Sequence, residues 1–269
     1  MNASLWLRLA AGLLLAAMVS ALAYRARALA TSGAVAASLI GAVVFGLGGL
    51  TPTILLLAFF LSSSALSLVG RQRKRALEAV AAKGARRDAR QVLANGGLAA
   101  SCAALWGLSG SEPFLAAVVG ALAAATADTW GTEIGVLSPA VPRRVTDWQP
   151  VAVGASGGVT LYGSVASLAG AGLIGLLAVL MQGGGRLLVA GLTGGLLGAA
   201  ADSLLGASLQ AGYWCPVCQR ATEHTPVHGC GSPTQLQRGL AWLDNDGVNL
   251  VATLVGAATA ALVAALAVD

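Results

Sequence analysis

Long apolar runs separated by short polar segments dominate the pattern of this chain. Their approximate bounds are residues 5–24, 30–49, 52–70, 93–109, 113–136, 158–181, 187–206 and 247–268. A helix of roughly 20 residues crosses the hydrocarbon core of a bilayer, and helices are required because no water satisfies the backbone there. The pattern predicts an all-α, polytopic bundle of about eight transmembrane helices, in which the first run is a retained helix and not a cleaved signal peptide.

The composition agrees with a single membrane domain that covers residues 1–269. Hydrophobic residues make up 57% of the chain and charged residues 10%, whereas soluble domains carry roughly 25% charged residues. So few charges cannot cover a water-exposed surface. Glycine is abundant, with 36 residues, and small side chains let membrane helices approach one another closely.

The positive charges are concentrated in one segment. The chain has a net charge of +5, and half of its 16 Lys and Arg residues lie between Arg71 and Arg90. Such a segment between two apolar runs is typical of a cytoplasmic loop and does not require nucleic-acid binding. If this basic loop, residues 71–92, is cytoplasmic and the helices alternate, the outer side keeps only Arg8 and Arg186. We therefore expect a multi-pass protein of a prokaryotic cytoplasmic membrane, with both termini outside the cytoplasm.

Two apolar runs end in a similar way. GALAAATADT, from Gly120, and GGLLGAAADS, from Gly194, each place a small residue at every fourth position before Asp128 and Asp202. This spacing keeps each row on one helical face, where small residues allow close packing. Both carboxylates should then point into the bundle, and an ionisable residue in a membrane segment indicates function. The alternatives are that the acids merely end helices at the water interface and that the similarity arose by chance in Gly/Ala-rich sequence.

Glu133 is a further candidate acid. It follows Asp128 by five residues, which is about 140° around a straight helix. The two carboxylates would share a site only if the helix breaks at Gly131, and otherwise each serves a different partner.

A polar cluster precedes the last apolar run. It consists of Asp244, Asn245, Asp246 and Asn249. Carboxylate and amide oxygens are the hard ligands that Mg²⁺ prefers. One such residue would be enough to cap a helix, and the excess favours a metal site formed with Asp128 and Asp202.

Four expected helix starts contain glycine next to Ser, Asn or Asp. Free N–H groups at a helix start bind anions, and glycine lets a phosphate come close. Ser and Asn also simply cap helices. Arg143 and Arg144 could add charge to phosphate oxygens, although lipid headgroups would explain them equally well. The four starts are Ser32-Gly33, Asn95-Gly96-Gly97, Ser156-Gly157-Gly158 and Asp246-Gly247.

A Cys/His loop, residues 211–238, follows the seventh run. Cys215, Cys218 and Cys230 lie close together with His224 and His228. In a reducing cytoplasm disulfides are not expected, and three thiols with one histidine suit tetrahedral Zn²⁺. Such a closed site would be structural, with either His228 or His224 as its fourth ligand. The alternative is a loop with incidental thiols.

Five motifs resemble a known membrane family. VLANGG (92–97), ADTWGTEIG (127–135), GASGGV (154–159), DSLLGASLQ (202–210) and LDNDGVNL (243–250) are similar, in order, to the family called domain of unknown function 92. That family includes animal transmembrane protein 19 and the plant phytyl-phosphate kinase. The Cys/His loop departs from the plant and animal pattern. The positions that the resemblance favours are Asn95, Asp128, Glu133, Ser156, Gly157, Asp202, Asp244, Asn245 and Asn249.

The resemblance implies a membrane kinase that converts an isoprenoid monophosphate, phytyl or polyprenyl, to the diphosphate. A nucleotide triphosphate, CTP or ATP, would be the donor, with Mg²⁺ at the cytoplasmic face. The chain contains no GxxxxGK[ST] motif, so its nucleotide site would differ from a P-loop. The alternative is an ion-coupled transporter or lipid flippase, in which Asp128 and Asp202 bind an ion or a proton. A flippase should place its polar groups near the midplane, whereas these lie near one face. The oligomeric state is left open.

Overall fold

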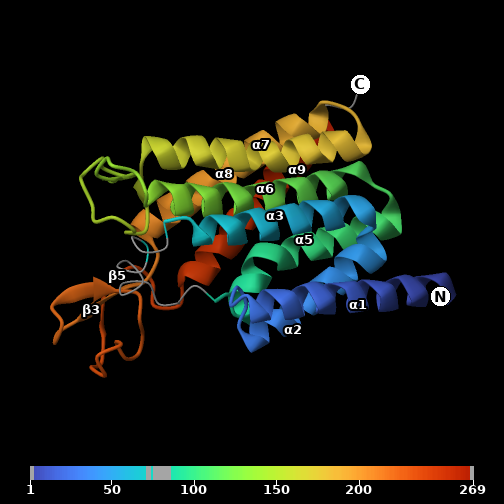
Figure 1. The fold of residues 1–269 in the computed structure, drawn as a ribbon. Coiled ribbons are helices and arrows are strands. Elements are labelled where there is room, and N and C mark those ends of the chain that lie inside the picture. The colour runs from blue at the N-terminus through green and yellow to red at the C-terminus, as the bar shows by residue number, and fades with distance from the viewer. Residues whose placement is uncertain (1–2, 71–73, 75–85, 267–269) are drawn as a thin grey trace.

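The computed structural model describes residues 3–70, 74 and 86–266, and its described part is a bundle of long helices (Figure 1). Within that part, eight helices are long and apolar enough to cross a membrane, as the apolar runs predicted. They are α1 (Ala3–Arg25), α2 (Thr31–Val43) with its continuation η1 (Val44–Gly48), α3 (Leu50–Leu68), α5 (Ala89–Ser109), α6 (Glu112–Gly135), α7 (Leu161–Gln182), α8 (Arg186–Ser208) and α9 (Asn245–Leu266).

Short strands lie at one end of the bundle, in the connections between helices, and the sequence pattern did not predict them. In the connection between α6 and α7, β1 (Arg143–Arg144) pairs antiparallel with β2 (Gly158–Val159). The Cys/His loop forms a three-stranded antiparallel sheet of order β4-β3-β5, made of β3 (Gly212–Cys215), β4 (Arg220–Thr222) and β5 (Gln235–Arg238). These strands give the long connections a fixed shape beside the helix ends.

Two helices begin elsewhere than the apolar pattern indicated. Helix α5 starts at Ala89, where the Asp88 carboxylate accepts the Gln91 N–H at 2.9 Å. Helix α7 starts at Leu161. Its capping residue is Thr160, whose hydroxyl accepts the Gly163 N–H at 3.1 Å. Capping side chains, and not the first apolar residue, fix these boundaries.

The helices alternate in direction, so the long connections gather at one end, which we call the polar end. It contains the described parts of segments 26–30, 69–88, 136–160 and 209–244, while both chain ends lie at the opposite end (Figure 1). Most of the basic loop, residues 71–73 and 75–85, lies outside the described residues. The described arginines of the connections thus share one end, as the charge pattern required, while the assignment of that end to the cytoplasm stays a prediction.

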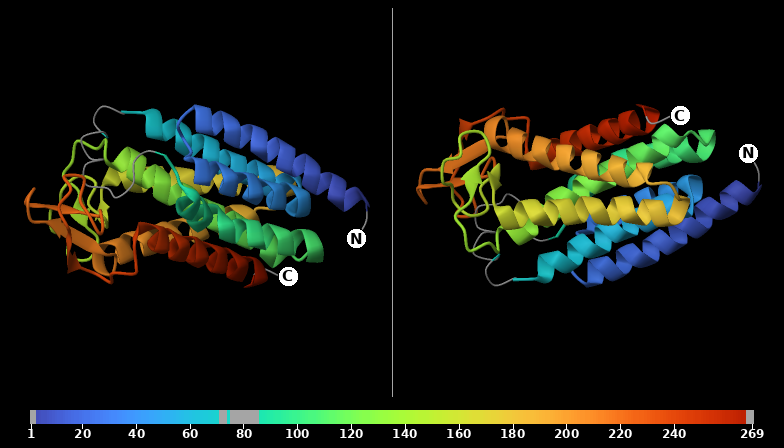
Figure 2. Two further views of the ribbon diagram at one scale, coloured as in Figure 1. Left: turned by 90° about the horizontal axis from the view of Figure 1, so that it is seen from below. Right: turned by 90° about the horizontal axis from the view of Figure 1, so that it is seen from above.

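Helix α6 forms the centre of the bundle. Its residues from Leu115 to Ala127 are all buried, and it contacts α3, α5, α7, α8 and α9. In both views of Figure 2, α1 and α2 lie on one flank and α8 and α9 on the other. An almost wholly apolar helix is stable in this position because it is surrounded by other helices.

Small residues set the register of α6, α8 and α9. A Cβ atom built on Gly120 would lie 2.2 Å from the carbonyl oxygen of Gly256, and one on Gly194 would lie 2.6 Å from the same oxygen. One turn further, a Cβ on Gly198 would lie 2.4 Å from the Cβ of Ala124. The two similar segments therefore run side by side and in register, which confirms the predicted close packing of the small-residue rows.

Candidate functional site

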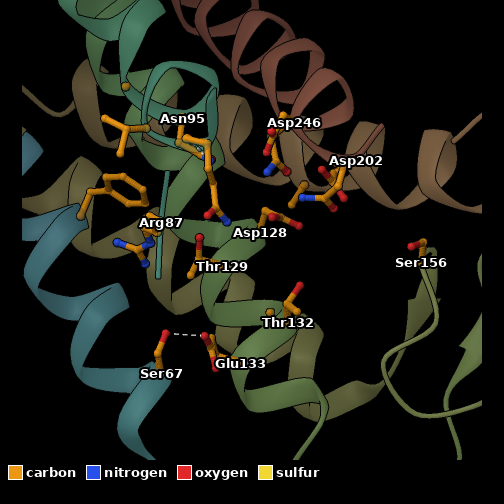
Figure 3. Close-up of a pocket in the computed structure, with 18 of the residues that line it drawn as sticks. Ser67, Arg87, Asn95, Asp128, Thr129, Thr132, Glu133, Ser156, Asp202 and Asp246 are labelled. Carbon is orange, nitrogen blue, oxygen red and sulfur yellow. Dashed lines mark hydrogen bonds between the residues drawn. The ribbon is translucent and has the colours of Figure 1, made fainter. Parts of the chain in front are cut away.

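A cavity of about 1130 Å³ opens at the polar end and is lined by residues from most of the helices. Its volume slightly exceeds the ~300–1000 Å³ of typical small-molecule pockets. Both acids that end the small-residue rows line it, as do the predicted polar residues at the start of α9. Figure 3 shows Asp128, Asp202 and Asp246 converging from different helices.

Asp128 and Asp202 meet in this cavity because the rows before them are in register. Each lies one helical turn beyond the contact between Ala124 and Gly198, so the two carboxyl groups lie near each other in the cavity (Figure 3). The Oδ2 atom of Asp202 is buried and has no hydrogen-bond partner among the described residues. Two carboxylates this close repel each other unless a cation or a proton lies between them. The pair is therefore suited to binding a divalent cation.

The start of α9 contributes the third carboxylate. Asp246 is buried, lines the cavity and points toward the same region as Asp128 and Asp202 (Figure 3). Asn245 and the buried Asn249 also line the cavity. These side chains add carboxylate and amide oxygens to the pair.

Asp244 has a capping role. Its Oδ1 accepts the Gly247 N–H at 3.0 Å, and its Oδ2 pairs with Arg90 at 2.9 Å. The helix-capping interpretation therefore holds for this member of the cluster. It also means that the N–H of Gly247 is already bonded, so Gly247 does not offer the free N–H that phosphate binding was expected to use.

Glu133 lies in a different part of the cavity. Helix α6 continues without a break to Gly135, so Glu133 points away from Asp128, as a straight helix requires (Figure 3). Its carboxylate accepts a hydrogen bond from Ser67 and forms an ion pair with Lys74. The structure thus separates Glu133 from the three aspartates and gives it cationic neighbours.

Three cations from the basic segment line the cavity: Lys74, Arg87 and Arg90. The guanidinium of Arg87 stacks over the rings of Phe59 and Phe60 at 5.8 and 5.6 Å. Burial lowers the pKa of this guanidinium, while the nearby Glu133 acts in the opposite direction. The sequence indicated a cationic loop but contained no signal that singled out these three residues.

Two of the predicted glycine-containing helix starts do not offer free N–H groups to the cavity. Gly96 and Gly97 lie inside α5, which begins at Ala89, so their amides are bonded within the helix. Gly33 is at the start of α2 as predicted, but its Cβ position lies 2.1 Å from the carbonyl oxygen of Arg87. Ser32 accepts the N–H of Ala89 at 3.3 Å. Gly33 and Ser32 therefore hold α2 against the segment before α5, and neither lines the cavity.

Asn95, one of the predicted site residues, lines the cavity. Its amide donates to the carbonyl of Gln91 at 3.0 Å within α5, and its side chain points toward the aspartates (Figure 3). The Oε1 atom of Gln91, which also lines the cavity, is buried without a hydrogen-bond partner among the described residues. This wall therefore offers neutral polar groups to a ligand.

Ser156 and Gly157 form a turn and Gly158 begins β2, so this cavity-lining segment is not a helix start as expected. Gly157 has a φ of 78°, and its Cβ position lies 2.5 Å from the backbone nitrogen of Ala207. Only glycine fits this left-handed conformation so close to α8. The Ser156 hydroxyl donates to Glu223 at 2.7 Å, a contact that the sequence pattern did not indicate.

Arg143 and Arg144 do not line the cavity, contrary to expectation. Arg143 donates to the carbonyl of Trp148 at 2.8 Å, and Arg144 pairs with Asp147 at 3.1 Å. Both contacts are local, and they brace the loop around β1. Phosphate binding in the cavity would therefore rely on other cations.

The potential zinc ligands gather outside this cavity. Ligand atoms of Cys215, Cys218, His228 and Cys230 all lie within 4.8 Å of one another. None of the four lines the cavity. The side chains that the sequence grouped thus lie close together, and His228, not His224, is the histidine among them.

The cavity also has an apolar part. It extends away from the aspartates between α1, α2 with η1, and α3. The side chains that line it are almost all aliphatic or aromatic. They include Leu15, Val19, Ile40, Val44, Leu56, Leu57, Phe59 and Phe60.

Together the eight helices and the acids that line the cavity at one end define a polytopic membrane protein with a polar, ligand-sized site. The chain matches the model of the family Integral membrane protein DUF92 over residues 14–257, and it belongs to that family. It is 32% identical to Protein PGR of Arabidopsis thaliana over 282 aligned residues, 95% of this chain and 96% of that protein. It is 31% identical over 250 residues to an uncharacterized membrane protein of Methanocaldococcus jannaschii, 93% and 92% of the two chains. No solved structure matches.

Proposed function

We propose that this protein is a membrane-embedded kinase that phosphorylates an isoprenoid monophosphate, phytyl or polyprenyl, to the diphosphate. A nucleotide triphosphate, CTP or ATP, is the donor. The supporting observation is that, among the described residues, a single cavity joins four aspartates and three cations at the polar end to an apolar stretch between α1, α2 and α3. A lipid with a charged head needs both surroundings at once.

The apolar part suits the substrate tail. Its walls, from Leu15 and Val19 on α1 to Phe59 and Phe60 on α3, contribute almost no polar side chains. An isoprenoid chain could lie there in place of lipid tails, because the lining is about as apolar as the hydrocarbon of the bilayer. Its head would then lie at the polar end, among the aspartates and cations.

The polar part suits Mg²⁺ and phosphate. Asp128, Asp202 and Asp246, with the amide of Asn249, would hold Mg²⁺, which would neutralise charge on the phosphates. The buried, unpartnered Oδ2 of Asp202 fits this role. Lys74 and Arg87 would bind phosphate oxygens as charge-assisted donors.

The proposed reaction is a single phosphoryl transfer. An oxygen of the lipid phosphate attacks the γ-phosphorus of the nucleotide and forms a P–O bond. The bond between that phosphorus and the β,γ-bridging oxygen breaks, and the nucleoside diphosphate leaves. The side chains in the wall orient both phosphates and stabilise charge on the transferred group.

The depth of the acids favours an enzyme over a transporter or flippase. Asp128 and Asp202 lie six or seven residues from the polar-end termini of α6 and α8, which is about 10 Å along the helix axis. They are therefore displaced toward one face, whereas transport sites lie near the bilayer midplane.

Purified protein in lipid nanodiscs would test the proposal directly. Labelled ATP or CTP and Mg²⁺ are added with phytyl, geranylgeranyl and longer polyprenyl monophosphates. We expect transfer of the γ-phosphate to at least one of these lipids and none without Mg²⁺. Folded protein that transfers no label from either nucleotide, but moves an ion or a lipid across liposomes, would support the transporter alternative instead.

A further inference from the structure

The Cys/His loop brings four metal-binding side chains together outside the cavity. Cys215 ends β3, Cys218 follows in the next turn, and His228 and Cys230 come from the connection between β4 and β5. Cys215 and His228 are buried, whereas Cys218 and Cys230 are exposed. The cluster therefore links separate parts of the loop at its surface.

The spacing of these atoms is that of a tetrahedral metal site. The Sγ atoms of Cys215 and Cys230 are 3.6 Å apart, and His228 Nδ1 lies 3.6 Å from Cys218 Sγ and 3.1 Å from Cys230 Sγ. Zinc–sulfur bonds of 2.3 Å in a tetrahedron place two sulfurs about 3.8 Å apart. The observed separations are thus close to those around one Zn²⁺.

The surroundings of the four ligands fit a zinc–thiolate centre. The N–H of Cys218 points at the sulfur of Cys215 at 3.4 Å, which stabilises negative charge on that sulfur. Arg220 lies 3.3 Å from His228 Nε2 and offsets the excess charge of three thiolates. The ring of His224 packs edge-on against that of His228, as a neighbour and not as a ligand.

The same loop forms part of the cavity wall. Glu223 directly follows β4, and its Oε1 accepts hydrogen bonds from Ser156 at 2.7 Å and from the buried Gln210 at 2.9 Å. Glu223, Gln210 and Tyr213 all line the cavity. Strand β4 is held by its pairing with β3, which places Cys215 opposite Arg220. The position of Glu223 therefore depends on the fold of the loop.

We propose that Cys215, Cys218, His228 and Cys230 bind one Zn²⁺, and that this ion fixes Glu223 in the cavity wall. Four protein ligands leave no open coordination position, so the zinc is structural. Because a short loop with three small strands has little apolar core, metal ligation supplies much of its folding free energy. Glu223 acts as a positioning residue that ties the Ser156 turn to the end of α8. None of this depends on the reaction at the aspartates.

Metal analysis of purified full-length protein tests the site. Wild-type protein should contain about one zinc per chain, and Cys218→Ala and His228→Ala should each reduce this to a small fraction. The matched controls are Cys102→Ala, a cysteine within α5, and His224→Ala, and both should retain the metal. Replacement by Co²⁺ should give the visible absorption of a tetrahedral thiolate site. Folded wild-type protein without zinc, or with Cys215 and Cys230 joined as a disulfide in thiol counts, would overturn the proposal.

Hydrogen exchange tests the link to the cavity wall. Removal of zinc by a chelator should speed amide exchange in two separate segments, 154–158 and 209–224, while the centre of α6 stays protected. Glu223→Gln should keep the zinc but loosen the 154–158 turn, because a neutral amide is a weaker acceptor for Ser156 and Gln210. Unchanged exchange at 154–158 after loss of the metal would refute the positioning role. These readouts involve no substrate, so they stand or fall separately from the kinase proposal.

Discussion

The carboxylate of Asp202 lines the cavity and has a buried oxygen without a hydrogen-bond partner among the described residues. The carboxylate of Asp128 lies near it (Figure 3). A buried carboxylate oxygen is costly unless a cation or a hydrogen-bond donor compensates it. Replacing Asp202 is therefore the most direct single test of the proposed magnesium site.

Asp202→Asn keeps the size of the side chain and removes its charge. We expect kinase activity to fall by at least about 100-fold, because lost metal charge stabilisation costs several kcal/mol and each ~1.4 kcal/mol is tenfold in rate. The rate of label transfer from nucleotide to lipid measures this. Asp147→Asn, on the exposed loop around β1, is the matched control and should leave the rate nearly unchanged. Full activity of Asp202→Asn would exclude this residue as a ligand that the reaction needs.

At the scale of elements, the contact among α6, α8 and α9 determines whether the aspartates meet. This contact consists of glycines and alanines whose backbones nearly touch. Because it has no spare volume, an added methyl group must push two helices apart. The site and the packing of the bundle are thus coupled.

Gly256→Ala should destabilise the protein. The new Cβ would lie 2.5 Å from the carbonyl oxygen of Gly120 and 2.7 Å from the Cβ of Ala124. Overpacking of this kind costs about 1–3 kcal/mol, which should lower the midpoint of thermal unfolding in detergent. Gly185→Ala adds the same methyl group where no atom lies within 4 Å and should leave the midpoint unchanged. Equal midpoints for the two variants would contradict the tight crossing.

Substitutions on α2 test whether the apolar part of the cavity binds the lipid tail. Ala37 lines it, whereas Leu39 on the same helix is exposed on the outer surface. Ala37→Phe should fill the groove and raise KM for a long isoprenoid phosphate by about tenfold, with a smaller effect on a short one. Leu39→Phe, which faces away from the cavity, should change neither. Equal effects of Ala37→Phe on long and short lipids would argue against tail binding in this groove.

At the scale of the whole molecule, the charge pattern makes a prediction about orientation. The polar end carries the basic segment and most of the other cations, so we expect it to face the cytoplasm. Both chain ends lie at the opposite end (Figure 1). A phosphatase fused to the C-terminus should therefore be active outside the cytoplasm of a bacterial host, and a fluorescent protein fused there should stay dark. A bright fluorescent fusion with an inactive phosphatase would reverse the orientation and place the cavity on the outer face.

The sequence by itself determined the helices and the inward-facing side of Asp128 and Asp202. Apolar run length fixes how many segments cross the membrane, because an unbonded backbone is too costly in lipid. A row of small residues at every fourth position fixes which helical face packs closely. Both properties are local, so the positions of Asp128 and Asp202 at the end of their rows could be predicted from the order of residues alone.

Only the tertiary structure decided which residues of the connections between helices line the cavity. Lys74 and Arg87 enter the cavity, and Glu223 reaches Ser156 across 67 residues of sequence. Gly96 is inside a helix because Asp88 caps α5 earlier than the apolar run suggested. Such positions depend on turns, caps and contacts between distant segments, whose free energies are a few kcal/mol at most. No periodic pattern marks them, so the chain must be folded before they can be assigned.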